Sequence, residues 1–510
     1  MRDLALPRGD WQLVIGGAVL LCAAYPPFHL FFPSFVCLVP AVWLILTGQE
    51  DERPVRRQLA QGFWFGLLAN ALVLYWIVVA LWRFSRLSAL AFGVTVVILG
   101  ILTACTFALT GWILRRTGLG VLVVFPVLWT ATEWVIGNLP QVGFPWLGLG
   151  TSLTGFPTVV QLADIVGARG VTYLLVLANT ALAVAWLRRR ERARAAWIAG
   201  GVAIGLVLAV AYGVVRERSV ALRPVGRIAV MQPNVGWREK WETTAQDSTV
   251  EALLNLAARA IYESEPGLMV WPETAIPGYF HNHPRWRERI TELARATRVP
   301  QLVGGHDFEL YDDGTHDYYN AAFLFDSLGS MDGQPAYHKQ YLVPIVERVP
   351  FVNPRWFGMD FFGGFGWGDP GQVFEVGVGR FGTLICYEST FEDLSRDYRN
   401  RGAEFLVNIT NDAWYGRTSA VYQHAAHLVM RAIENRVGIA RAANSGISEF
   451  VDPLGRQHRR TELDVKTFAA HELVTSDVIT LYTRFGDWVG TIVIVLAVGL
   501  CGAALRRRSV

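Results

Sequence analysis

The residues best suited to chemistry in this chain lie in its second half, and the first of them is a lone cysteine. Cys386 ends the apolar stretch FGTLIC, and the following YESTF predicts a turn that leads into a helix. A nucleophile at such a turn is exposed at a sheet edge, beside backbone N–H groups that could stabilise an oxyanion. Because most free cysteines are simply small buried hydrophobic residues, position alone leaves both interpretations open.

A glutamate, a lysine and a histidine are candidate partners for this thiol. Glu273 follows the apolar run LMVWP, where partial burial would make its carboxylate a better base, although a turn or capping acid is the ordinary alternative. Lys339 lies among aromatic and aliphatic residues in an arginine-rich chain, so the site could need its compact ammonium, although a lone lysine is normally a solvated surface residue. His338 could instead pair with Cys386, as in thiol proteases. Since no metal-ligand spacing or phosphate-binding glycine loop stands out, we expect no metal and no bound cofactor.

A membrane domain must help to position these residues. The chain has 510 residues, 52% of them hydrophobic, and a mean hydropathy of +0.30, which is typical of a membrane domain joined to a second domain. A bilayer core of about 30 Å needs around 20 apolar residues per helix. Eight segments are candidate spans, and they run roughly from Trp11 to Tyr25, Leu30 to Thr47, Leu59 to Trp82, Leu87 to Leu114, Leu119 to Gly137, Val171 to Leu187, Ala196 to Val215 and Trp488 to Leu505.

Cysteine usage and charge narrow the class of protein further. The four cysteines other than Cys386 lie in apolar stretches, so no disulfide framework is expected. The first apolar segment is followed by two prolines rather than a cleavage site, so we expect the first helix to be retained. The net charge is only +3, and the arginines form short runs rather than a basic face, which argues against nucleic acid as a partner.

The arginine runs also predict how the chain crosses the membrane, because short loops rich in Arg and Lys stay in the cytoplasm. Arginines gather in every second connection, at 53–57, 115–116 and 188–194, and again in the tail at 506–508. Both termini are therefore predicted to be cytoplasmic. The segment from about residue 216 to 485 is predicted to lie outside the cytoplasm, between a membrane domain of residues 1–215 and a last span with its tail at 486–510.

The long segment between the seventh and eighth spans has the pattern of an α/β domain, because short strand-like runs alternate in it with amphipathic helices. Helices are predicted over Thr249 to Ile261, Trp286 to Arg298, Phe391 to Arg399 and Ala420 to Asn435. The predicted strands are RIAVMQP, LMVWPET, QLVGG, NAAFLFD, FGTLICYE, EFLVNIT and GIARAAN.

Two features have open roles. Glu133, near the end of the fifth predicted span, could handle substrate or could simply reach headgroup water. The loop 350–371 combines many glycines with many aromatic residues, so it could dip into the membrane interface or pack on the domain's own core.

Taken together, WPETAIP, YHKQYLVPIVE, LICYE and NITNDAWYG, in this order within one α/β domain, resemble the nitrilase superfamily. The resemblance implies an αββα sandwich in which Glu273 is the general base, Lys339 the cation beside the tetrahedral intermediate, and Cys386 the nucleophile.

Such a domain between membrane spans resembles the apolipoprotein N-acyltransferases in particular, and GFPW at 143–146 with EW at 133–134 also fits. Where many relatives have VPFGE, this chain has VPIVE, which keeps the acid. The resemblance implies further site residues, which are Glu347, Tyr387, Glu388, Trp241, Trp414 and Tyr415.

The resemblance implies an enzyme of the inner membrane that transfers a fatty acyl chain from phospholipid to the N-terminal amine of a diacylated lipoprotein through a Cys386 thioester. It implies a phospholipid donor, a lipoprotein acceptor and a monomer. Two alternatives stay open from the sequence: a membrane-tethered amidase in which water resolves the thioester, and a non-catalytic lipid-binding scaffold.

Overall fold

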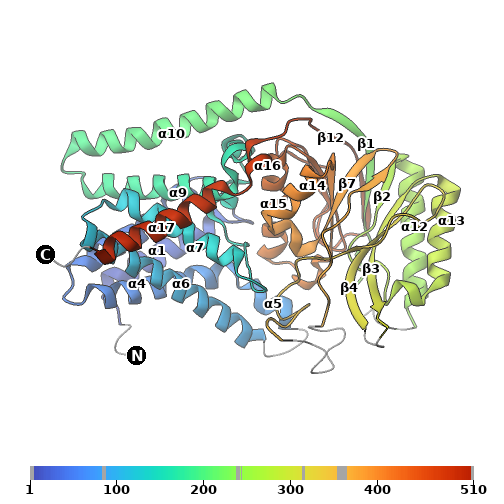
Figure 1. Cartoon of the computed structure of the whole chain (residues 1–510), viewed down its shortest axis with the longest axis horizontal. Coiled ribbons are helices and arrows are strands. Elements are labelled where there is room, and N and C mark those ends of the chain that lie inside the picture. Colours follow the sequence, from blue (N-terminus) through green and yellow to red (C-terminus); the bar gives the residue numbers. More distant parts are fainter. Residues whose placement is uncertain are drawn as a thin grey trace.

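The structure is a computed structural model that describes residues 5–82, 88–236, 240, 242, 244–312, 316–352 and 364–506. It has two parts, a bundle of helices and a sandwich of two β-sheets (Figure 1). The bundle is formed by the first half of the chain and by the last helix, α17 (Trp488–Arg506), which returns to it after the sandwich.

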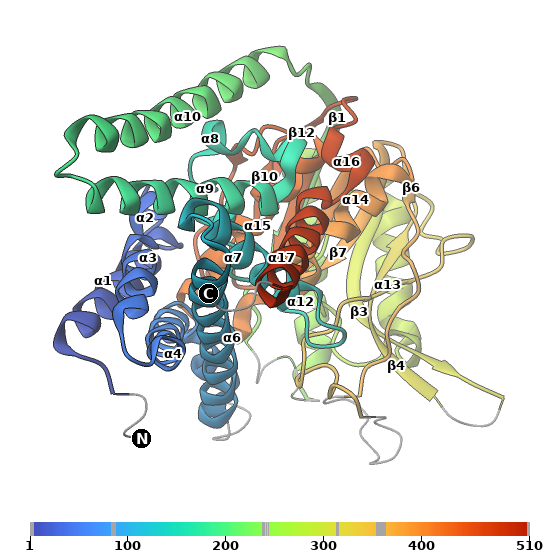
Figure 2. The same ribbon diagram turned by 60° about the vertical axis from the view of Figure 1, so that its left-hand side comes forward.

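Among the residues that the structure describes, six segments of the bundle are long and apolar enough to cross a membrane. They are Pro33–Glu50, which holds α2 (Pro33–Val36) and α3 (Val39–Thr47), then Ala89–Thr117 in α6 (Ser88–Thr117), α7 (Val121–Asn138), α9 (Ala163–Leu187), α10 (Arg192–Ser219) and α17. Only 6% of the apolar window of α10 is buried, and this helix lies at the outside of the bundle beside α9 (Figure 2). Such an apolar, uncovered helix needs lipid around it.

The other two expected spans differ from a simple crossing helix. The first is α1 (Arg8–Ala24), which has 17 residues. The third was expected as one helix from Leu59 to Trp82, but the chain breaks between α4 (Pro54–Val73) and α5 (Trp76–Trp82). At this break the carbonyl oxygen of Val73 has no helical partner, and it accepts a hydrogen bond of 3.3 Å from Nε2 of Gln423 in the sandwich.

In the described ranges, each sheet of the sandwich has six strands. The first has the order β12-β1-β2-β3-β4-β5 and the second the order β11-β10-β9-β8-β7-β6. In each sheet three neighbouring strands are parallel, β1, β2 and β3 in the first and β7, β8 and β9 in the second. The strands are β1 (Arg223–Gln232), β2 (Leu268–Val270), β3 (Gln301–Leu310), β4 (His316–Phe325), β5 (Tyr337–His338), β6 (Phe374–Val376), β7 (Gly379–Ile385), β8 (Phe405–Thr410), β9 (Gly438–Ala443), β10 (Glu449–Val451), β11 (Gln457–His458) and β12 (Thr467–Thr475).

The strands are buried in continuous runs because both faces of each sheet are covered, and successive side chains enter different cores. In β1, Ile228 and Val230 pack in the core that joins the sheets, whereas Ala229 and Met231 pack in a second core under the helices. The helices over this second core are α12 (Gln246–Ser264) and α13 (Pro284–Thr297), on the first sheet. The second sheet is covered by α14 (Glu392–Asn400) and α15 (Ser419–Asn435). The layers are therefore αββα, as the family resemblance implied.

Helix α15 joins the two parts of the molecule. Every residue of it except Tyr422 is buried, because it lies between the second sheet and the bundle (Figure 1). Its Gln423 accepts hydrogen bonds from the indoles of Trp76 (3.1 Å) and Trp146 (2.8 Å). Just beyond its end, the fully buried Arg436 pairs with Asp164 of α9 at 2.6 Å. Buried polar bonds of this kind hold the sandwich in one orientation on the bundle.

Candidate active site

The cysteine singled out in the sequence stands on a tight turn directly after β7. Cys386 has a φ of 53°, which is unusual for a residue with a side chain, and it begins the 3₁₀ turn Cys386–Thr390. Its carbonyl oxygen accepts hydrogen bonds from Nε2 of His424 (2.9 Å) and the hydroxyl of Ser389 (3.0 Å). The strained turn is thus held by the helix behind it.

The environment of the thiol keeps it protonated in the resting protein. Cys386 is only 7% exposed, and burial raises its pKa well above the ordinary value. The negative charges of Glu273 and Asp412 raise this pKa further, while the ammonium of Lys339 lowers it. A thiol in this state needs a base to become a nucleophile.

Glu273 is a candidate for that base. It follows β2, is 5% exposed, and accepts hydrogen bonds at both oxygens, from Nδ2 of Asn320 (2.7 Å) and the backbone N–H of Asn411 (2.7 Å). The loop that carries it lies against Gly304 of β3, where an added Cβ would come within 2.4 Å of the Pro272 carbonyl oxygen and 2.8 Å of the Glu273 Cα. Only glycine permits this close approach, which sets the position of the carboxylate.

Lys339 lies between two carboxylates just after β5. Its Nζ is 2.9 Å from Oε1 of Glu347 and 3.7 Å from Oε1 of Glu273, and the side chain is 1% exposed. Burial alone would lower the pKa of Lys339, but the charges of Glu347 and Glu273 outweigh it and raise the pKa above its usual value. The ammonium is therefore a permanent positive charge beside the thiol.

Glu347 and Asn320 complete this group. Nδ2 of Asn320 donates to Glu347 Oε1 at 3.0 Å as well as to Glu273, and the backbone N–H of Val343 donates to Glu347 Oε2 at 2.7 Å. The backbone carbonyl oxygen of Asn320 accepts from the N–H of Lys339 (2.9 Å). One residue of β4 thus orients both carboxylates and the lysine. Sequence reasoning missed Asn320, because only its place in β4 beside β5 gives it this role.

Tyr387 and Glu388 follow the cysteine and both are buried. The hydroxyl of Tyr387 donates to the carbonyl oxygen of Gly143 at 2.8 Å, and its ring stacks near Phe144 and Trp146 of the bundle. Burial raises the pKa of Glu388 to about 7, although the hydrogen bonds that it accepts and the charge of Lys339 oppose this shift.

The remaining predicted residues fall in different places. Tyr415 is 9% exposed and its ring packs against Trp76 and Trp146, with Trp414 partly buried in the same cluster. Trp241 lies outside the described residues. His338, the alternative partner of the thiol, pairs through Nε2 with Asp307 at 2.8 Å, and its ring stacks on Tyr319.

Behind the thiol lies a buried network that sequence reasoning also missed. His424 contacts Asp412 through Nδ1 at 3.0 Å, and Asp412 in turn pairs with Arg441 at 2.8 Å. The pKa of Asp412 falls to about 2: burial raises it, but the charge of Arg441 and the bonds from His424 and Thr410 more than reverse that effect. These residues come from α15, from the turn after β8 and from β9, so only the packing of these elements brings them together.

Two features with open roles are now placed in part. Glu133 accepts hydrogen bonds from the indole of Trp129 (2.9 Å) and the N–H of Leu149 (3.2 Å), and it lines a cavity of about 80 Å³ inside the bundle. Of the aromatic loop, Phe365 is buried and Trp367 is 43% exposed beneath the guanidinium of Arg348. The aromatic residues at 356, 357, 361 and 362 lie outside the described residues.

A two-sheet sandwich with a glutamate, a lysine and a cysteine, each just after a strand, defines a nitrilase-type domain, and residues 227–478 match the family model described as carbon-nitrogen hydrolase. Residues 17–181 match the model of the apolipoprotein N-acyltransferase N-terminal domain. The chain is 34% identical to the apolipoprotein N-acyltransferase of Geobacter metallireducens, over 99% of this chain and 97% of that protein. It is 31% identical to that of Methylococcus capsulatus, over 98% and 96%. The chain belongs to the apolipoprotein N-acyltransferase family.

Two solved structures match about half of this chain. An amidase from Nesterenkonia sp. has a TM-score of 0.38 and 20% identity, covering 52% of this chain and 95% of that one. Nit3 of Saccharomyces cerevisiae, a member of the nitrilase superfamily, has a TM-score of 0.38 and 17% identity, covering 49% and 90%.

Proposed function

We propose that this membrane acyltransferase moves a fatty acyl chain from a phospholipid to the N-terminal amine of a diacylated lipoprotein, through a thioester on Cys386. The acyltransferase activity rests on the family to which the chain belongs. The observation that carries the chemical route is the position of Lys339 between Glu347 and Glu273, at 2.9 and 3.7 Å, beside a buried thiol.

In the first step Glu273 takes the proton of the Cys386 thiol, and the thiolate attacks the ester carbonyl carbon of the phospholipid. The ammonium of Lys339 stabilises the oxyanion, and a well-placed donor of this kind contributes about 3–4 kcal/mol. The tetrahedral intermediate then expels the lysophospholipid oxygen, which takes the proton from Glu273. A thioester and a lysophospholipid result.

In the second step the lipoprotein amine attacks the thioester carbonyl. Glu273 accepts the proton of the amine and returns it to the sulfur as the carbon–sulfur bond breaks. Release of the amide product leaves the site with its free thiol, as it began. Asn320 and the N–H of Asn411 hold the Glu273 carboxylate in place during both transfers.

The bundle supplies the route to lipid. Each buried CH₂ holds an acyl chain in the bilayer by about 0.8 kcal/mol, so a long chain costs roughly 12 kcal/mol to extract. The reacting thiol must therefore lie at the membrane surface. The indole and phenol rings of Trp76, Trp146, Tyr387 and Tyr415 form a continuous apolar cluster between the cysteine turn and the bundle, which suits this position.

The proposal includes eight spans, with α1 and α4 as the two beyond the six apolar segments, and a chain divided at 1–215, 216–485 and 486–510. The α9–α10 connection and the end of α17 lie at the end of the bundle away from the sandwich (Figure 1), and the sequence is rich in arginine at both places. The positive-inside rule then places that end in the cytoplasm and the sandwich outside the inner membrane. We take the enzyme to act as a monomer.

The test is intact mass spectrometry of the purified chain after exposure to phospholipid. We expect Cys386 to gain one acyl mass and to lose it when a diacylated lipopeptide is added, with the acyl group recovered on the peptide amine. Cys386→Ala and Glu273→Gln should form no adduct, whereas Cys105→Ala in α6 should behave as the unaltered chain. Rapid release of free fatty acid without peptide would support an amidase instead, and full activity of Cys386→Ala would support a non-catalytic scaffold.

A further inference from the structure

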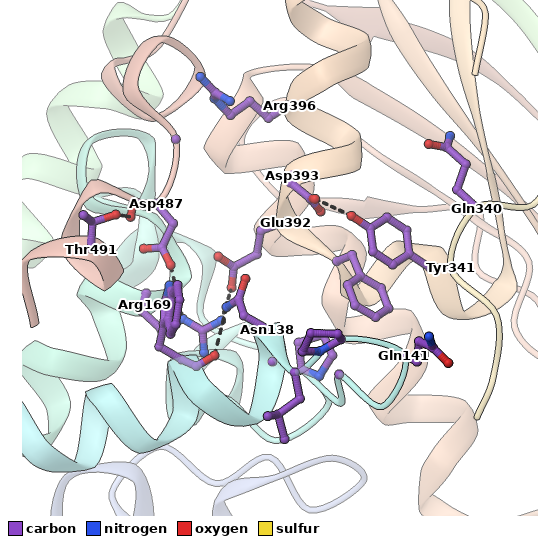
Figure 3. A pocket seen from close by; sticks show the side chains of 18 of the residues that line it. Asn138, Gln141, Arg169, Gln340, Tyr341, Glu392, Asp393, Arg396, Asp487 and Thr491 are labelled. Atoms are coloured by element: carbon purple, nitrogen blue, oxygen red, sulfur yellow. Dashed lines mark hydrogen bonds and ion pairs between the residues drawn. The ribbon is translucent and has the colours of Figure 1, made fainter. Parts of the chain in front are cut away.

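A polar cavity of about 540 Å³ opens between the sandwich and the bundle, and Figure 3 shows side chains that line it. Its walls come from the end of α7 and the loop after it, the start of α14, residues 340–342, and the junction between α16 (Leu481–Phe485) and α17. None of Glu273, Lys339 and Cys386 lines it. Phe391 forms part of the partition, with its ring 4.0 Å from that of Tyr341 and 5.1 Å from that of Tyr387.

The charges that line this cavity are balanced. Three arginines and three acids face it, and they are Arg169, Arg348, Arg396, Glu392, Asp393 and Asp487. A purely anionic ligand would be repelled by the three acids, and a purely cationic ligand would be repelled by the three arginines. A ligand that carries both a phosphate and an ammonium satisfies both sets.

Arg169 is held in the cavity wall with bonding capacity to spare. Its side chain is 5% exposed and its ion pairs are long, 3.4 Å to Glu392 and 3.5 Å to Asp487. The longer of these pairs is made by Nε, which faces Asp487 Oδ2 but makes no hydrogen bond within the described part of the chain. Figure 3 shows this side chain directed between the two acids. An unsatisfied donor on a buried cation indicates a missing acceptor.

Arg396 adds a second positive charge from the opposite wall. Its guanidinium donates to the carbonyl oxygens of Thr483 (2.8 Å) and Arg484 (3.0 Å). These acceptors are neutral, so the bonds orient the side chain without compensating its charge. They also hold it over the junction that leads into α17.

An apolar groove of about 610 Å³ continues from the cavity along the start of α17. Leu481, Phe485, Trp488, Thr491 and Ile492 line it, and Phe485 and Thr491 line the cavity as well. Leu481, Phe485 and Ile492 are 46%, 67% and 46% exposed, which is costly in water but suits contact with an acyl chain. A charged headgroup cavity that runs into an apolar groove at the end of a membrane helix has the form of a lipid site.

We propose that the cavity and groove together bind one zwitterionic phospholipid from the leaflet next to the sandwich. Its phosphate faces Arg169 and Arg396, its ammonium faces the acids at Glu392 and Asp393, and an acyl chain lies along the groove. This lipid is additional to the acyl donor at Cys386. It is a non-reacting ligand that fills the seam between the sandwich and α17.

The experiment uses the full chain in nanodiscs that contain a phosphatidylcholine with a photoreactive diazirine on its acyl chain. After irradiation, peptide mapping by mass spectrometry should find cross-links concentrated in residues 481–495. Cys386→Ala should keep these cross-links, so failure of the acyl-transfer proposal and failure of this one are distinguishable. Cross-links spread over all lipid-facing helices in proportion to their exposure would overturn the site.

Two variants and a matched control sharpen the result. Arg396→Gln should reduce cross-linking at 481–495 by about tenfold, the effect of one charge-assisted hydrogen bond, while Arg401→Gln, just after the end of the same helix and outside the cavity, should leave it unchanged. Phe485→Ala, a surface change with little risk to folding, should weaken binding of a short-chain phosphatidylcholine in detergent but not of glycerophosphocholine. Equal cross-linking in Arg396→Gln and the control, or stronger competition by phosphatidylglycerol than by phosphatidylcholine, would refute a zwitterion site.

Discussion

Glu388 ties the loop of Lys339 to the turn of Cys386, and its substitution by glutamine is a sharp test of how the site is assembled. One carboxylate oxygen accepts from the N–H groups of Gln340 (2.6 Å) and Tyr341 (3.2 Å) and from the hydroxyl of Tyr337 (2.8 Å). The other accepts from the N–H of Ile385 at 2.7 Å. All four partners are donors, so the group must be an acceptor at both atoms.

A glutamine cannot meet this requirement. If its oxygen replaces the first carboxylate oxygen, its NH₂ group faces the N–H of Ile385, and the reverse orientation opposes three donors instead of one. An unsatisfied buried N–H costs about 1–3 kcal/mol, and the remaining bonds lose the strength that charge gives them. We therefore expect Glu388→Gln to lower the unfolding free energy of the sandwich by about 2–4 kcal/mol.

The assay is thermal unfolding in detergent at pH 8, above the pKa of about 7 that burial gives Glu388, so that the unaltered group is ionised. The apparent melting temperature should fall by about 4 °C or more. In the folded variant, Cys386 acylation measured by mass spectrometry should also be slower. Glu375→Gln, the same change at an exposed position of β6, is the control. A Glu388→Gln variant that matches this control in both measurements would refute the reasoning.

Three other substitutions in the sandwich have expected outcomes. Asn320→Ala should slow Cys386 acylation about 100-fold, because it releases both carboxylates that Asn320 holds. Asn320→Asp should be slower still, because it adds a third acid. Acylation time courses in which either variant matches the unaltered chain would contradict this. His424→Ala removes a donor from the Cys386 carbonyl, so the unfolding free energy should fall by about 1–3 kcal/mol and kcat should fall more than KM rises; an unchanged kcat would show that the turn holds itself. Burial lowers the pKa of Lys240 from 10.5 to about 8, so between these pH values the unfolded state binds more protons than the folded state. The unfolding free energy should therefore rise by about 3 kcal/mol from pH 8 to 10.5. Denaturation curves of Lys240→Met, recorded over the same pH range, should lack this rise.

Family and fold class could be predicted from the sequence because they depend on local patterns. The expected strand FGTLICYE became β7 with a turn at Cys386, and the helix expected over 420–435 became α15, since hydrophobic periodicity and turn residues act over a few positions. The family resemblance, which rested on short motifs, is confirmed by similarity along nearly the whole chain. The roles of Glu273, Lys339 and Cys386 stay predictions that the geometry suits.

The membrane part was harder to predict in detail. Apolar length located the helices, but it could not show the break after Val73, because that break is stabilised by Gln423, 350 positions away in sequence. Nor could it separate the helices that face lipid from those that pack inside. Hydropathy measures composition, whereas the break and the packing depend on partners from the other part of the molecule.

What the sequence determined by itself is the set of elements and the residue types able to act at their ends. What only the tertiary structure decided is which side chains meet: Asn320 with both Glu273 and Glu347, His424 with the carbonyl of Cys386, and Asp307 rather than the thiol with His338. These contacts join residues up to 47 positions apart. They depend on strand order, register and the docking of α15, and those follow from burying two sheets and a helical bundle together, which no local pattern encodes.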